Sequence, residues 1–176
     1  GFSGCQVSQR GRFPLGTQLV LQDGRKFRFG LNGGVTGVVG DVAQTAVVIT
    51  TDHDLQPAAG AVGDRFVSIT HGAATTAQNY LAEGVAVMSL APGGGHTYKI
   101  AAHAALTSGG AGEIIWFAPG HAIREAITTT TDVDLHPHPY ASNIQIAATI
   151  TGIPTGVYVS ATAANRFHWL ATGGAC

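Results

Sequence analysis

The sequence predicts an all-β fold, either a barrel or a two-sheet sandwich of the jelly-roll kind, and three observations favour it. Apolar or alternating segments of about four to eight residues recur along the chain and end at glycine or proline. The 176 residues include 25 glycines and 7 prolines, which favour many turns. Charged residues make up only 11% of the chain, so the lysine and glutamate of exposed helices are scarce.

The N-terminal residues 1–16 lack any apolar periodicity, and they are predicted to form an extended arm before a single β domain over 17–176. Phe2, Val7 and Phe13 would let such an arm lie on a neighbouring subunit, although a frayed terminus explains the pattern equally well. The chain begins with glycine rather than methionine and stops abruptly at Cys176, soon after a Gly-Gly pair, so we expect both ends to be incomplete.

A β-hairpin is predicted over residues 18–29, where Asp23-Gly24 separates two extended segments. Asp-Gly supplies the positive φ angles of a two-residue turn. This turn would place Val20 opposite Phe27.

The middle of the chain predicts three further strands. Residues 65–70 alternate between apolar and polar side chains, which indicates a half-buried strand. Residues 85–90 form a continuous apolar run, which suggests a strand covered on both faces. Residues 97–100 alternate again, with Tyr98 and Ile100 on one side. Residues 73–83 suit either a short helix or a loop.

The remaining pattern predicts short strands joined by loops. Residues 31–46 suggest a loop with one short helix, and 136–140 a sheet edge or a loop, because their prolines cannot pair. Residues 143–151 alternate most cleanly, with Ile150 among the inward side chains. The further predicted strands are 47–51, 114–117, 157–160 and 165–170, the last with Phe167 and Trp169 on one face.

The charge balance argues against nucleic-acid and membrane partners. Nine basic and ten acidic residues give a net charge of −1, without a basic footprint. No apolar run approaches the roughly 20 residues that span a bilayer. Cys5 and Cys176 are expected to be free thiols, because the cytosol in which such a chain is made is reducing.

Histidines are the strongest hint of chemistry in the chain, which has eight of them. His136 and His138 would point to the same side of an extended segment, and His53 lies between two aspartates. Solvated loop histidines are commoner than metal ligands, so we expect no metal, no cofactor and no catalytic residue. A small metal-dependent enzyme is the least favoured alternative.

The two tryptophans are the other candidates for binding. Trp116 and Trp169 stand among apolar strand residues, where aromatic side chains are more often part of a core than of a sugar-binding platform. Together with Phe2, Val7 and Phe13 they are the predicted interaction residues.

Several phrases resemble a family of virion proteins of tailed phages, many from marine and cyanobacterial viruses. They are Gly-Asp-Arg-Phe-Val-Ser-Ile-Thr at 63–70, Asn-Tyr-Leu-Ala-Glu-Gly at 79–84, the glycines at 93–95, Tyr-Lys-Ile at 98–100 and Ala-His at 102–103. The hairpin phrase at 21–29 and the aromatic tail at 165–175 are similar to the same family.

The resemblance implies a capsid decoration or cement protein on the outer surface of a phage head, assembled in the host cytoplasm. Its partners would be the major capsid protein and copies of itself, with a homotrimer expected. The low charge is in keeping with a surface that other proteins cover. The alternative from another class is a head-fibre or receptor-binding β-sandwich that holds a glycan.

Overall fold

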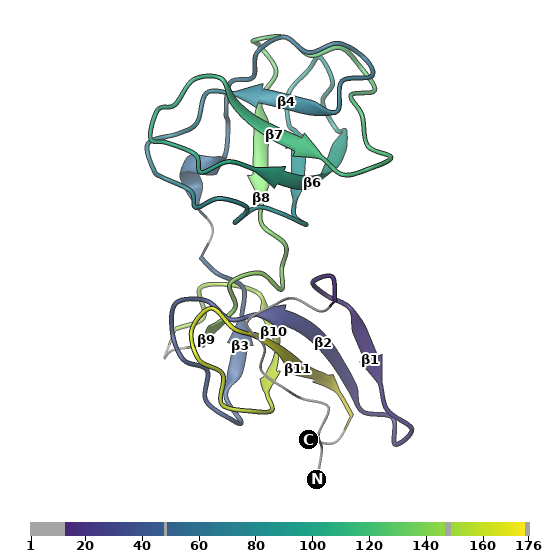
Figure 1. Ribbon diagram of the computed structural model, residues 1–176, viewed down its shortest axis with the longest axis vertical. Coiled ribbons are helices and arrows are strands. Elements are labelled where there is room, and N and C mark those ends of the chain that lie inside the picture. Colours follow the sequence, from purple (N-terminus) through teal and green to yellow (C-terminus); the bar gives the residue numbers. More distant parts are fainter. Residues whose placement is uncertain (1–12, 48, 147–148, 175–176) are drawn as a thin grey trace. The chain divides into compact units, whose positions relative to one another are not determined.

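The computed structural model describes residues 13–47, 49–146 and 149–174, and over these residues the chain is all-β, as predicted (Figure 1). Its named strands form two antiparallel sheets, one of six strands and one of five. The single helical element among these residues is a 3-10 turn, η1 (Thr50–Asp52). No helix in the described part of the chain has the length and apolar character needed to cross a membrane.

The contacts divide the chain into two compact units. The discontinuous unit comprises Gly1–Val48 and Pro139–Cys176, and the inserted unit comprises Ile49–His138. Residues 17–176 are predicted to form one β domain, whereas the contacts group the chain into two units. The boundaries of the inserted unit depend on contacts between distant segments, which local periodicities do not reveal.

The discontinuous unit contains the six-stranded sheet, in the order β1-β2-β11-β10-β3-β9. Strands from the start and the end of the chain alternate in it, because β2 pairs with β11 and β3 pairs with both β10 and β9. The strands are β1 (Gln18–Val20), β2 (Lys26–Leu31), β3 (Val42–Gln44), β9 (Ile144–Gln145), β10 (Pro154–Tyr158) and β11 (Phe167–Gly173).

The predicted hairpin is present as β1 and β2, but its register differs from the prediction. Leu19, not Val20, lies opposite Phe27. The amide of Leu21 donates to the Arg25 carbonyl, so three residues form the loop, and Gly24 supplies its positive φ of 83°. The one-residue shift directs Leu19 to the same face as Phe27 and leaves Val20 exposed.

The inserted unit contains the five-stranded sheet, in the order β4-β7-β6-β5-β8. The segment that follows η1 lies between the two edge strands. Leu55 exchanges two hydrogen bonds of 3.0 Å with Val133 of β8, and the neighbouring Pro57 forms a bridge with Ile69 of β4. This segment therefore closes the sheet into a small barrel. The strands are β4 (Phe66–Ile69), β5 (Val85–Met88), β6 (Thr97–His103), β7 (Glu113–Phe117) and β8 (Val133–His136).

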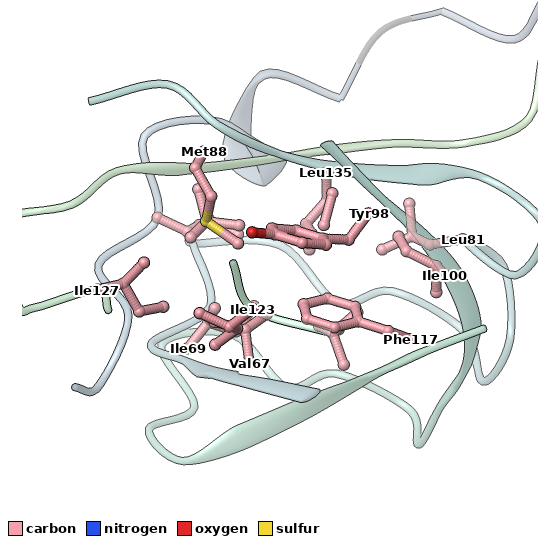
Figure 2. Close-up of a cluster of buried hydrophobic side chains, with 14 of the residues drawn as sticks. Val67, Ile69, Leu81, Met88, Tyr98, Ile100, Phe117, Ile123, Ile127 and Leu135 are labelled. Atoms are coloured by element: carbon pink, nitrogen blue, oxygen red, sulfur yellow. The ribbon is translucent and has the colours of Figure 1, made fainter. Parts of the chain in front are cut away.

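A single apolar core fills the inserted unit (Figure 2). Tyr98 stacks on Phe117 with ring centroids 4.7 Å apart, and its hydroxyl accepts the Arg124 amide at 3.1 Å. Fifteen buried residues belong to the cluster, including Leu81, Leu106, Ile123 and Ile127 from the connecting loops. The predicted alternation of β4 and β6 is confirmed, because Val67, Ile69, Tyr98 and Ile100 all point into this core.

Several local predictions are wrong. Within the predicted strand 47–51, η1 begins at Thr50; β3 lies where a short helix is expected, whereas residues 32–41 are loop, as predicted. β5 is covered on one face only, since Val85 is exposed. Residues 73–83, which suit either a short helix or a loop, form bends and turns, so the loop alternative is correct. The alternation at 143–151 yields only the short β9, and Ile150, which lies beyond it, is exposed.

Residues 1–12 of the predicted arm lie outside the described residues, and Phe13–Gly16 lie against the discontinuous unit's sheet. The Gly16 amide donates to the Phe29 carbonyl at 2.8 Å. The Phe13 ring packs against Phe29 and Trp169 with centroid distances of 5.6 and 5.7 Å. The end of the predicted arm is therefore part of this unit.

Candidate functional site

The structure places two of the predicted interaction residues in one aromatic cluster. Phe13 is 47% exposed, whereas Trp169 is only 7% exposed and packs edge-on to Phe29. Phe167 also stacks on Phe29, with ring centroids 5.5 Å apart and the rings nearly parallel. Trp169 is therefore a core residue of the discontinuous unit, and Phe13 presents the exposed edge of the cluster.

An apolar row continues from this cluster across the sheet. Phe27, Ala171, Val157 and Val42 lie directly opposite one another on β2, β11, β10 and β3, so their side chains share one face. Val42 is exposed, and Val157 is half-buried. The row therefore remains partly open where it crosses β10 and β3.

Two adjoining hollows follow this row, and we call them together the valine groove. One has a volume of about 550 Å³ and the other about 430 Å³, and they share Val157, Ala171 and Gly173. Val39 lines the first hollow and is 57% exposed. Arg25 lines the same hollow, and it is the one charged side chain among the described residues that line it. The groove thus offers an apolar surface with a single basic residue.

The underside of the groove rests on a buried polar network. The Tyr158 hydroxyl donates to Asn32 Oδ1 at 2.7 Å, and the Asn32 amide donates to the carbonyls of Val35 and Thr162. Burial raises the pKa of Tyr158 to about 12 and lowers the pKa of the stacked His168 to about 4. These groups stay neutral near pH 7, so they hold the loop that carries Val39 without adding charge.

Trp116 forms a separate exposed aromatic site on the inserted unit. It lies on β7 directly opposite Phe66 of β4, and the ring centroids are 5.3 Å apart. Trp116 is 48% exposed, and the neighbouring Ile114 is 38% exposed. Trp116 is therefore a surface residue and not part of the core. The other predicted interaction residues, Phe2 and Val7, lie outside the described residues, as do Cys5 and Cys176.

The histidines assemble differently from the prediction. His136 lies beside His53, with ring centroids 4.8 Å apart and the rings nearly perpendicular. Their ligand atoms and a carboxylate oxygen of Asp134 all lie within 4.8 Å of one another. His138, which the sequence pairs with His136, does not belong to this group. We call His53, Asp134 and His136 the histidine triad.

Two further histidines are buried in the inserted unit. His71 Nε2 lies 2.8 Å from Asp52 Oδ1, and its Nδ1 lies 3.2 Å from the Thr107 carbonyl. His103 Nε2 accepts the Leu81 amide at 3.0 Å, and burial lowers the pKa of His103. Both histidines are about 2% exposed, so their hydrogen bonds stabilise the interior and a substrate cannot reach their rings.

Sequence reasoning missed the valine groove. Val39 and Val42 fall in a segment that suggests a loop and a short helix, and Val157 falls in a predicted strand to which no function is given. The sequence does show several valines on a chain with few charges. Their proximity depends on the pairing of β10 with β3, which the sequence does not reveal.

No protein-family model, curated protein or solved structure matches this chain.

Proposed function

We propose that the chain is a capsid decoration protein that binds the outer surface of a phage head and stabilises the shell. Its partners are the major capsid protein and copies of itself, in a homotrimer. The observation that carries the proposal is the valine groove, an apolar surface on a chain with 11% charged residues. The resemblance of the sequence to phage virion proteins supports the choice of partner.

The groove suits a protein partner because paired strands form its floor and its rim is apolar. Val157 and Ala171 are fixed by direct strand pairing, so little conformational entropy is lost when a partner covers them. Val39 and Val42 at the rim are solvent-exposed in the free chain. Their burial contributes about 25 cal/mol per Å² of apolar area, repeated at every copy on the shell.

A decoration protein of this kind acts by mass action. It binds the assembled shell but not the dissociated subunits, and it thereby shifts the equilibrium towards assembly. The net charge of −1 lets copies approach each other on the shell with little mutual repulsion.

Adding the purified chain back to phage heads that lack it tests the proposal. Co-sedimentation measures binding, and the melting temperature of the heads measures stabilisation. We expect the wild-type chain to sediment with the heads and to raise their melting temperature. The double variant Val39→Lys/Val42→Lys should bind about tenfold more weakly or worse, because it places two ammonium groups in an apolar contact.

Val62→Lys/Leu90→Lys is the matched control. Both residues are exposed on the inserted unit, at 63% and 51%, and neither lines the groove. This variant carries the same added charge and should bind like the wild type. The proposal fails if the wild-type chain stays in the supernatant, or if the control loses binding as severely as the groove variant.

The exposed Trp116–Phe66 pair favours a second candidate, a glycan-binding head-fibre or receptor-binding module. Two adjacent aromatic rings at a surface offer a platform for the apolar face of a sugar. A glycan array followed by tryptophan fluorescence separates the two candidates. A glycan binder should shift the emission of Trp116 on titration, and Trp116→Ala should abolish the shift.

A further inference from the structure

We propose that the histidine triad, His53, Asp134 and His136, binds one divalent transition-metal ion, with Zn²⁺ as the natural candidate. The site is independent of the proposed capsid function. Two imidazoles and one carboxylate are ligands that zinc accepts, at about 2.0–2.2 Å from the metal. Tetrahedral ligands at that range lie about 3.3 Å apart. The three ligand atoms lie within 4.8 Å of one another, so modest side-chain rotations would close the site.

Two of the ligands are held by the same strand. Asp134 and His136 are two residues apart on β8 and therefore point to the same side of it. The alternate residues Val133 and Leu135 are buried in the barrel core, which fixes the strand and directs the two ligands outward. The spacing of ligands is thus set by strand geometry and by the core beneath it.

The third ligand comes from the segment that closes the barrel. Leu55 pairs with Val133, which brings the residues just before it to the free edge of β8. Asp54 adopts a positive φ of 54°, a conformation that aspartate tolerates better than most residues. This turn lets the chain pass from η1 to Leu55 while His53 lies against His136.

A hydrogen bond orients the carboxylate. The amide of Asp54 donates to Asp134 Oδ1 at 2.8 Å, which leaves the second oxygen for a metal. Metal-ligating carboxylates commonly have such a supporting hydrogen bond. All three ligands are half-buried, so an ion could enter from solvent and would retain coordination positions for water.

The surroundings suit a cation. Val85 and Val87 of β5 lie opposite His136 and Asp134, so the strand beside the triad contributes no positive charge. The carboxylate of Asp134 belongs to the triad itself and attracts a divalent ion. Nitrogen ligands favour zinc, nickel or copper over magnesium and calcium, which prefer oxygen.

Metal binding would stabilise the barrel at the point where the segment around Leu55 closes it. An ion shared between His53 and β8 links the closing segment to the edge strand, and it binds the folded chain rather than the unfolded one. It should therefore raise the melting temperature of the inserted unit by about 5 °C or more when free Zn²⁺ exceeds the dissociation constant a hundredfold.

The test uses the full chain purified without a polyhistidine tag, in a Cys5→Ser/Cys176→Ser background so that thiols do not compete for zinc. After treatment with a chelator, equilibrium dialysis and calorimetry measure the binding of Zn²⁺, Mg²⁺ and Ca²⁺ separately. We expect one Zn²⁺ per chain, the stated rise in melting temperature, and no comparable binding of Mg²⁺ or Ca²⁺.

Variants locate the site. His53→Ala, His136→Ala and Asp134→Asn should each weaken Zn²⁺ binding by about tenfold or more. His96→Ala is the matched control, because His96 lies on the inserted unit outside the triad, and it should bind zinc like the parent. Melting curves without metal verify that each variant folds. The proposal is overturned if the chain does not bind Zn²⁺, if the His53→Ala variant binds Zn²⁺ like the parent, or if Mg²⁺ binds equally well. It is also overturned if His138→Ala alone weakens Zn²⁺ binding as much as His136→Ala does.

Discussion

The two units solve the problem of burying a β-sheet in different ways. The inserted unit gathers fifteen buried apolar residues in one cluster inside a closed barrel. The discontinuous unit has two clusters, of four and three such residues, on its sheet. Nine of the fourteen exposed large apolar side chains of the described residues nevertheless belong to the discontinuous unit, and they are Phe13, Val20, Val35, Val38, Val39, Val42, Val47, Ile150 and Ile153.

The difference shows what each unit contributes. Closure by the Leu55 segment removes the sheet edges of the inserted unit, and its interior combines fifteen buried apolar residues with a few buried polar ones, among them Asp52, His71 and His103. The discontinuous unit instead fixes its loops through buried amides, with Asn32, Gln44 and Asn143 all about 1% exposed or less. Both units therefore combine buried apolar side chains with buried hydrogen-bonded groups, but the discontinuous unit has the smaller apolar clusters and more exposed large apolar side chains.

The largest expected effect concerns the barrel core. Ile115→Ala removes a side chain that is 0% exposed and should cost the inserted unit about 2–5 kcal/mol. Each unit holds one of the two tryptophans, so a Trp169→Phe background reports denaturation of the inserted unit through Trp116. The adjacent Ile114→Ala is the control, at about 1 kcal/mol or less, since Ile114 points outward. Equal losses would show that the barrel interior is not the principal core.

The next effect addresses close packing in the discontinuous unit. A Cβ atom at Gly37 would clash with the Tyr158 ring, so Gly37→Ala should destabilise this unit by about 1–3 kcal/mol. Gly34 has open space around it, and Gly34→Ala should be nearly neutral. Urea denaturation in a Trp116→Phe background, followed through Trp169, measures both. A neutral Gly37→Ala would mean that the loop above Tyr158 moves away at little cost.

A smaller effect depends on pH. Burial lowers the pKa of His168 to about 4, below the usual 6.5 of an unfolded histidine. Between these values the unfolded chain binds a proton that the folded chain does not, so stability falls as pH falls. The discontinuous unit should lose about 1 kcal/mol between about pH 6.5 and pH 5.5. His168→Gln should remove this part of the slope, and an unchanged slope would assign it to other groups.

The smallest effect is expected at the groove rim. Val39→Lys/Val42→Lys should change the stability of the isolated chain by about 0.5 kcal/mol per site or less, because both side chains are largely in water. The same Trp169 denaturation curve measures it. A large loss would mean that these valines support the fold, and it would weaken the comparison between the units.

Local patterns predicted the fold class and several strand faces. The alternation of Val67 and Ile69, and that of Phe167 and Trp169, is directly visible in the sequence and correct in the structure. The same rule fails at Ile150, because alternation records polarity and not whether a partner strand is present.

What the sequence did not predict depends on contacts between distant segments. The pattern singled out His53 and His136 separately, but it joined His136 to its neighbour His138. The pairing of Leu55 with Val133 brings His53 to β8, and no local periodicity encodes it. The hairpin register likewise depended on whether two or three residues form the loop, which Asp-Gly alone does not decide.

The insertion has a consequence for how the chain could be rearranged. Gln44 pairs with Ile144 in the discontinuous unit, and Leu55 pairs with Val133 in the inserted unit, so each unit holds its own entry and exit segments side by side. A module whose ends are neighbours can be excised, transplanted into another loop or exchanged for a different module without unravelling its host. The inserted unit is therefore well placed for exchange by recombination. If it were deleted and a short linker joined the two ends of the discontinuous unit, the shorter chain would retain the six-stranded sheet.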